Sequence, residues 1–196
     1  MFLALAMCFA IASARAADIV IQSAQLVASD EGYSLSANFS INLGARLEDV
    51  VSKGVDLYFA ADFELTRARW YWFDEKVVQR NKTFQLSYHV LTRQYRLSSG
   101  GLHQSFASLD DALRVLSRLR HWQVIDKGEV GGGVAYVAAT RLRLDPSQMP
   151  KTFQVSALSN REWSQSSEWL RWGFSVPEPV EVPEGGVDSA EAGAAK

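Results

Sequence analysis

The sequence predicts a mainly β fold: an antiparallel β-sandwich-like domain of about eight strands, with one docked α-helix at 108–121 and a short helix at 46–53. Apolar and polar residues alternate over long stretches, which is typical of strands that are buried on one side only. The continuous apolar runs that mark parallel strands, buried on both faces, are missing. These two observations favour antiparallel sheets that form a sandwich or an open barrel, of which we predict the sandwich.

The strands follow one another along most of the chain. Residues 33–43 alternate most clearly, and residues 18–28 are expected to pair with them across the turn Asp30-Glu31-Gly32. The other expected strands are 55–66, 69–79, 83–97, 134–144 and 163–176. The alternation changes phase between Val90 and Leu91, which indicates a β-bulge within the strand 83–97.

Two segments show helical spacing. Ser108 and Asp111 form a capping box at the start of 108–121. One face of this helix is apolar and is expected to dock on a sheet: Leu109, Ala112, Leu113, Leu116 and Leu119. The shorter helix at 46–53 stops at Gly54. Gly131-Gly132-Gly133 lacks the Lys-Ser/Thr of a phosphate-binding loop, so we expect a mobile hairpin connection there.

Residues 1–16 predict export. An apolar run ends in Ala14-Arg15-Ala16, which matches the A-x-A cleavage site of a secretory signal peptide. The run is shorter than the ~20 apolar residues that a membrane-spanning helix needs, so we expect no transmembrane segment in the mature chain. No Lys or Arg precedes it, and a start upstream of Met1 is an open alternative. We expect a periplasmic or secreted protein, cleaved near Ala16.

Cleavage there would leave a mature chain without cysteine, because Cys8 is the only one. Disulfides, thiolate nucleophiles and sulfur ligands for zinc would then be excluded. Residues 17–176 suffice for one hydrophobic core and are expected to form a single β-rich domain. Residues 177–196 are rich in Pro, Gly and acidic side chains and are expected to be a disordered tail.

The charge of the chain argues against nucleic acid as a partner. The formal net charge is −2, and the tail carries an acidic excess: Glu178, Glu181, Glu184, Asp188 and Glu191. The domain itself is therefore nearly neutral, whereas a nucleic-acid-binding domain usually carries a strongly basic face. We expect no nucleic-acid partner.

Tryptophan and arginine gather in the middle of the chain, and both are favoured anchors of protein interfaces. In a strand, Trp70 and Trp72 would share one side, so they form either an exposed platform or part of the core. Basic residues on neighbouring strands would attract an anionic partner such as a phospholipid headgroup or an acidic protein loop. The candidate partner-binding residues are Arg67, Arg69, Trp70, Trp72, Arg93 and Arg96, with Arg80 and Lys82 in the same basic set. Alternatively, nearby carboxylates neutralise them: Asp62, Glu64, Asp74 and Glu75.

Residue patterns that would indicate catalysis are missing. His89, His103 and His121, expected in a strand, a loop and a helix end, lack the spacing that places two metal ligands on one helical face. No G-x-S-x-G motif is present to hold a nucleophilic serine. We therefore assign no catalytic, cofactor-binding or metal-ligating residue, and expect no enzyme and no cofactor. A hydrolase would need His89 or His121 beside a serine or carboxylates.

Several short stretches resemble a family of exported proteobacterial proteins defined only as domain of unknown function 4390. The stretches are Arg69-Trp70-Tyr71-Trp72, Leu86-Ser87-Tyr88, Tyr95-Arg96-Leu97, residues 153–158, Arg161-Glu162-Trp163 and residues 169–172. The resemblance covers most of the expected domain and brings no catalytic residue. It implies genes that lie beside a two-component sensor-kinase pair, and hence a link to envelope signalling with a membrane sensor kinase as a partner.

Together these features predict an exported, non-catalytic binding or accessory module of the bacterial cell envelope. Its expected partners are an envelope protein or a sensor kinase, with an anionic or apolar ligand. The alternative is a periplasmic carrier of a lipid or another small apolar molecule, which would need an apolar cavity through the domain.

Overall fold

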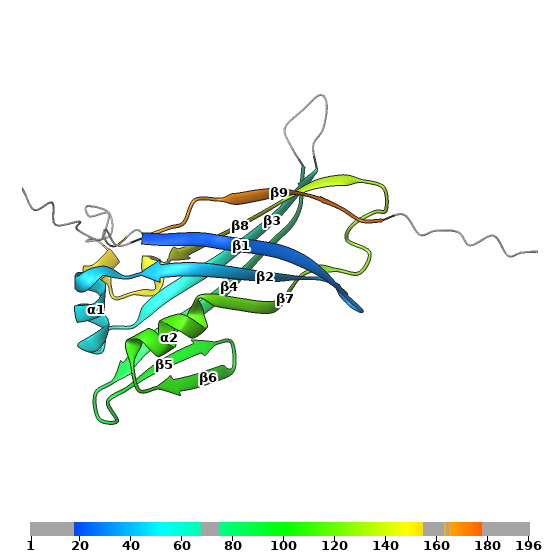
Figure 1. The fold of residues 1–196 in the computed structure, drawn as a ribbon. Coiled ribbons are helices and arrows are strands. Elements are labelled where there is room, and N and C mark those ends of the chain that lie inside the picture. The colour runs from blue at the N-terminus through cyan, green and yellow to red at the C-terminus, as the bar shows by residue number, and fades with distance from the viewer. Residues whose placement is uncertain (1–17, 68–74, 155–162, 164, 178–196) are drawn as a thin grey trace, which may run out of the picture.

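The computed structural model describes residues 18–67, 75–154, 163 and 165–177. Within them, two antiparallel sheets pack face to face (Figure 1). The three-stranded sheet has the order β1 (Asp18–Ser29), β2 (Gly32–Asn42), β7 (Arg118–Asp126). The six-stranded sheet has the order β6 (Leu102–Phe106), β5 (Gln94–Ser99), β4 (Glu75–His89), β3 (Leu57–Arg67), β8 (Ala135–Leu144), β9 (Leu170–Ser175). The predicted mainly β, sandwich-like fold is confirmed.

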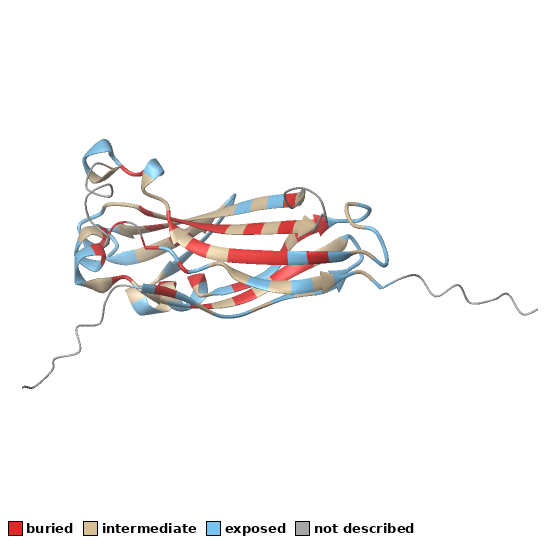
Figure 2. Cartoon of the chain, turned by 90° about the horizontal axis from the view of Figure 1, so that it is seen from above, coloured by how far each residue is buried: buried red, intermediate tan, exposed pale blue. Residues whose placement is uncertain are grey.

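The core lies between the two sheets, as the buried bands along the strands show (Figure 2). Alternate side chains of β3 point inward and are fully buried: Leu57, Phe59, Ala61, Phe63 and Leu65. From the opposite sheet, β2 contributes Leu35, Ala37 and Phe39. Both strands show the period of two that their sequences predict.

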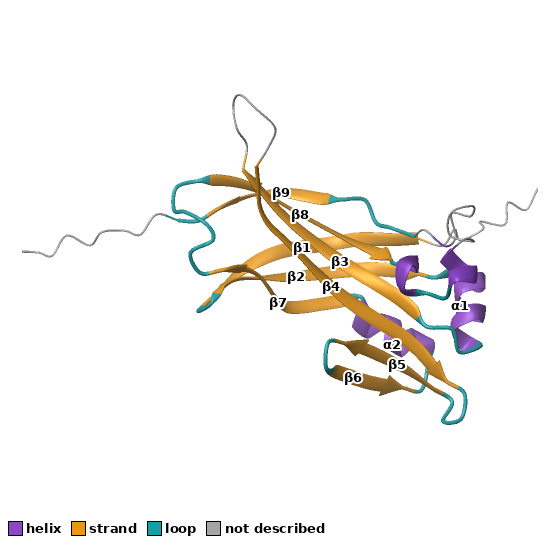
Figure 3. Ribbon diagram, turned by 180° about the vertical axis from the view of Figure 1, so that it is seen from behind, coloured by secondary structure: helices purple, strands orange, loops and turns teal. Residues whose placement is uncertain are grey.

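The helices lie where the strands leave apolar surface uncovered. Helix α1 (Gly44–Ser52) buries Leu47 and Val51, as predicted for 46–53. Helix α2 (Leu109–Leu116) buries Ala112 and Leu116, and it lies against β5 and β6 on the same side as the three-stranded sheet (Figures 1 and 3). A 3-10 turn, η1 (Pro146–Gln148), follows β8. In the described part of the chain, no helix has the length and apolar character to cross a membrane.

The predicted helix 108–121 is wrong beyond Leu116. Its start is confirmed, because the Ser108 side chain accepts a hydrogen bond from the Asp111 backbone N–H at 3.1 Å. From Arg118 onward the chain is β7, in which buried Leu119 pairs with Ala37 of β2. Leu116 and Leu119 fit a helical face as well as a helix followed by a strand, so their spacing did not separate the two. The positive φ of His121, 48°, lies where the register between β2 and β7 shifts.

The predicted break between the strands 69–79 and 83–97, and the end of the second, are also wrong; residues 69–74 lie outside the described residues. A single 15-residue strand, β4, runs from Glu75 to His89, and residues 90–93 form a turn into β5. The phase change at Val90 and Leu91 therefore marks this turn and not a bulge. Strand β6 was not expected, because four of its five residues are exposed and show no alternation. The described residues thus contain nine strands.

The segment around the three glycines is not a hairpin, because β7 and β8 belong to different sheets. It carries the chain from one sheet to the other. The Gly131 N–H donates to the Tyr136 hydroxyl at 3.0 Å, and the Gly133 N–H donates to the Val176 carbonyl at 3.1 Å. The last predicted strand, 163–176, is confirmed only as β9.

Because the six-stranded sheet is wider than its partner, its β4–β5–β6 end extends past the three-stranded sheet (Figures 1 and 3). Helix α2 covers the inner face there, where Leu86 and Leu97 are buried. The opposite face of these three strands carries no covering element in the described structure. It is the face on which the candidate site lies.

Candidate anion-binding site

The structure separates the sequence-predicted site residues into distant groups. Arg67 ends β3 and donates to Glu75 at 2.6 Å, at the start of β4. Arg96 of β5 pairs with Ser87, near the other end of β4 and roughly 40 Å of strand away. Arg93 lies in the turn after β4. Arg69, Trp70 and Trp72 fall outside the described residues, so their place in core or surface stays a prediction.

The outer face of the β4–β5–β6 end is polar in every strand. Cross-strand pairing aligns Ser87, Arg96 and Ser105, so their side chains share one face. The adjacent residues Leu86 and Leu97 point the other way and are buried. We define the outer polar face by these residues: Gln85, Ser87, His89, Gln94, Arg96, Ser98, His103 and Ser105.

Arg96 lies at the centre of this face, and its guanidinium is half-buried. Its Nε atom is buried, and the described structure offers it no hydrogen-bond partner. An unsatisfied buried donor costs about 1–3 kcal/mol, and more when it is charged. A guanidinium held in this state is stabilised by any acceptor that reaches it.

Two open depressions meet at Arg96. The larger, of about 320 Å³, is bounded by Asp56, Gln85, Ser87, Tyr88, His89, Val90, Leu91, Arg96 and Ser98. The smaller, of about 190 Å³, is bounded by His89, Thr92, Gln94, Arg96 and Ser105. The one carboxylate among these residues, Asp56, accepts a hydrogen bond from Gln85 Nε2 at 2.8 Å. In both depressions Arg96 is surrounded mainly by side chains that can donate hydrogen bonds as well as accept them.

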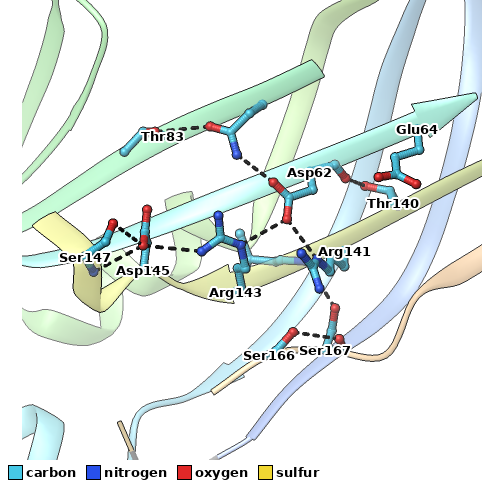
Figure 4. A network of polar contacts seen from close by, with 12 residues as sticks. Asp62, Glu64, Thr83, Thr140, Arg141, Arg143, Asp145, Ser147, Ser166 and Ser167 are labelled. Carbon is cyan, nitrogen blue, oxygen red and sulfur yellow. Dashed lines mark hydrogen bonds and ion pairs between the residues drawn. The ribbon is translucent and has the colours of Figure 1, made fainter. Parts of the chain in front are cut away.

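On the outer face of this sheet, the charges where β3 meets β8 are paired. Figure 4 shows Asp62 between two arginines, with its Oδ2 atom 2.8 Å from Arg141 Nε and 3.0 Å from Arg143 Nε. The other carboxylate oxygen accepts from Asn81 Nδ2 at 2.6 Å. Arg143 also faces Asp145. Burial opposes ionisation of the Asp145 carboxyl, but hydrogen bonds, chiefly from Ser147, lower its pKa below the usual value. Because these groups satisfy one another, the network is structural.

The other predicted cations have partners too. Arg80 donates to Glu129 at 2.7 Å and lies 3.2 Å from Asp126. Burial opposes ionisation of Glu129, but hydrogen bonds from the Asp126 N–H and from Arg80 lower its pKa below the usual value. Lys82 lies 5.9 Å from the centre of the Phe84 ring. Within the described residues, only Arg93 and Arg96 of the predicted set have neither an ion pair nor a ring contact.

Sequence reasoning missed a signal at this end of the sheet. Residues 76–109 contain no Asp or Glu, although the chain has 22 of them. The same segment holds five basic residues: Lys76, Arg80, Lys82, Arg93 and Arg96. It comprises β4 after Glu75, the turn 90–93, β5 and β6, so a local excess of positive charge was readable before the structure.

The histidines do not form a metal site. His89 and His103 lie on the outer polar face, on β4 and β6, while His121 lies on β7 of the other sheet. The expected loop for His103 and helix end for His121 were therefore wrong. Over the residues that the structure describes, no three His, Cys, Asp or Glu side chains gather to hold a metal ion.

The chemistry of the outer polar face suits an oxyanion. A guanidinium offers donors in a planar fork that matches carboxylate and phosphate oxygens. Serine hydroxyls, glutamine amides and imidazoles beside it are further donors. Such a set binds an anionic group without forming or breaking a covalent bond.

Comparison with known proteins identifies the family of the chain. Residues 16–173 match the family described as Domain of unknown function (DUF4390), and the chain belongs to it. No catalytic family is matched. Neither the curated proteins nor the solved structures include one with significant similarity to the chain.

The contrast between Asp62 and Arg96 gives a test of their roles. Asp62→Asn should lower the free energy of unfolding by about 1–3 kcal/mol, because two partly buried guanidinium groups lose their shared carboxylate. Arg96→Gln should not lower it and should raise it by up to about 1–3 kcal/mol, since no ion pair is broken and an unsatisfied buried donor is removed. Urea denaturation of both variants measures these values. A loss in Arg96→Gln as large as that in Asp62→Asn would make Arg96 a structural residue.

Proposed function

We propose that this protein is an exported, non-catalytic binding module of the bacterial cell envelope, which binds an anionic group of its partner at the outer polar face. One observation carries the proposal: the buried Nε of Arg96 lacks a partner in the described structure, while charges nearby on the same sheet are paired. A binding site that is empty keeps such unsatisfied donors, and a structural ion pair does not.

The shape of the site supports binding to the end group of a larger partner. Its larger depression, about 320 Å³, is at the small end of ligand pockets, which span about 300–1,000 Å³. It opens onto a flat sheet face. A phosphate or carboxylate group fits this space, while the rest of the partner stays outside.

The interior favours a surface site over an internal cavity for an apolar ligand. Phe59 and Phe63 fill the space between the sheets, and both are fully buried.

Support for a non-catalytic role comes from the histidines. In the part of the chain that the structure describes, no hydrogen bond joins His89, His103 or His121 to a serine or a carboxylate. The proton transfers of a hydrolase would need such contacts.

Location and partner rest on the sequence. Residues 1–16 lie outside the described residues, and export is proposed from their apolar run and Ala14-Arg15-Ala16. A link to a membrane sensor kinase and envelope signalling is proposed from the family resemblance alone.

Binding of a simple oxyanion tests the site. Titration of the labelled protein with inorganic phosphate should shift the NMR signals of the Arg96 guanidinium, because that group gains an acceptor. Arg96→Gln should weaken phosphate binding at least about tenfold. The matched control is Arg118→Gln, an exposed arginine on the other sheet, which should leave binding unchanged. Equal binding by Arg96→Gln and the original protein would exclude the site.

Cell fractionation tests export. The full chain expressed in a Gram-negative bacterium should accumulate in the periplasm or medium, with its first residue at Ala17 after cleavage of the leader. Ala16→Tyr should accumulate uncleaved, because signal peptidase sites need a small residue there. Recovery of the uncleaved original chain from the cytosol would contradict export.

A further inference from the structure

The tip of the β4–β5 hairpin exposes two adjacent apolar side chains. Leu91 is 96% exposed and Val90 is 63% exposed. They belong to an exposed run, 89–94, which projects at the end of the six-stranded sheet beyond α1 (Figure 1). Isolated exposed apolar residues are common on protein surfaces, but here the two are neighbours at a projecting point.

Positive charge surrounds this apolar tip. Arg93 lies in the same turn, and Arg96 is the third residue of β5, on the outer polar face behind the tip. The segment 76–109, which includes the β4–β5 hairpin except Glu75, holds no carboxylate to oppose them. Val90 and Leu91 also border the larger depression at Arg96. The apolar tip and the candidate oxyanion site therefore form one continuous surface.

The carboxylates nearest to the tip come from α1 and the segment after it. Asp49 pairs with Lys53 at 2.7 Å, and Asp56 is hydrogen-bonded to Gln85. Burial is the main cause that raises the pKa of the Tyr95 hydroxyl, and the nearby Tyr88 and Glu48 raise it further. Glu48 itself is exposed. Glu48 thus opposes an anionic partner on the α1 side, and beside the outer polar face the opposing carboxylate is Asp56, which accepts a hydrogen bond from Gln85.

The shape of the tip selects among anionic partners. A protein partner would need a groove to receive a convex tip, and a stable protein interface buries about 800 Å² on each side. Two side chains on a turn supply only a small part of that area. A bilayer needs no matching shape, because apolar side chains enter between its lipids and basic residues meet its phosphate groups.

We propose that the β4–β5 hairpin docks on an anionic phospholipid bilayer, with Val90 and Leu91 inserted below the headgroups and Arg93 and Arg96 bound to lipid phosphates. This inference rests on the proposed oxyanion site and names the source of the oxyanion, which is the phosphate group of a membrane lipid. The module would then attach to a membrane surface by its tip, which leaves the three-stranded sheet and the opposite end of the domain free.

Vesicle sedimentation tests docking of the hairpin on the bilayer. The full chain is expressed, and the protein is purified as it accumulates in the cells, cleaved or uncleaved. It should bind vesicles of phosphatidylcholine mixed with phosphatidylglycerol, and bind pure phosphatidylcholine vesicles much less. High salt should also weaken binding to the mixed vesicles, because it screens the charges. Leu91→Ser and Arg96→Gln should each weaken binding about tenfold. The matched control is Leu102→Ser, because Leu102 is 81% exposed but lies on β6, away from the tip. Unchanged melting temperatures would show that all variants are folded.

The outcomes separate this inference from the proposed function. Phosphate binding at Arg96 without vesicle binding would refute the lipid partner and leave the oxyanion site standing. Failure of both would refute both. Vesicle binding that Leu91→Ser leaves unchanged would also refute the inference, as would a preference for an acidic peptide such as polyglutamate over the vesicles.

Discussion

The inner face of a six-stranded sheet has to be shielded from water, and a three-stranded sheet covers only part of it. Helix α2 shields the remaining part, where it buries Ala112 and Leu116 above the β5–β6 end. The rest of the structure depends on this division of the inner face between the three-stranded sheet and α2. It explains why the chain forms a helix between β6 and β7, why the β4–β5 hairpin extends past the sandwich, and why the outer side of that hairpin is open in the described structure.

The treatment of charge differs between the two ends of the same sheet. Near β8, Asp62 holds two arginines, and each group is satisfied by its neighbours. At the β4–β5–β6 end, Arg96 is half-buried with an unsatisfied Nε. Packing alone would not retain such a group, because it lowers stability. Binding residues often have this property, since the interactions that would stabilise the free protein are kept for the partner.

Much of the fold was readable from the sequence, because burial on one side imposes a period of two that β2 and β3 keep over most of their length. The start of α2 was readable from Ser108 and Asp111, since a helix cap is a local interaction. The end of α2 was not, because Leu116 and Leu119 suit both a helix and a strand. The role of Arg96 was hidden for another reason. Whether an arginine is paired depends on distant residues, as with Arg80 and Glu129, which lie 49 positions apart. Only the lack of acidic residues in 76–109 was visible in advance.

The central claim is that Arg96 is held ready for an external oxyanion. A crystal structure of the protein grown with tungstate tests it most directly, because the anomalous signal of the metal locates the anion. The account predicts a tungstate group within hydrogen-bond distance of the Arg96 guanidinium, on the outer polar face. An electron density map in which Arg96 instead pairs with a carboxylate of its own chain, with no anion beside it, would contradict the account.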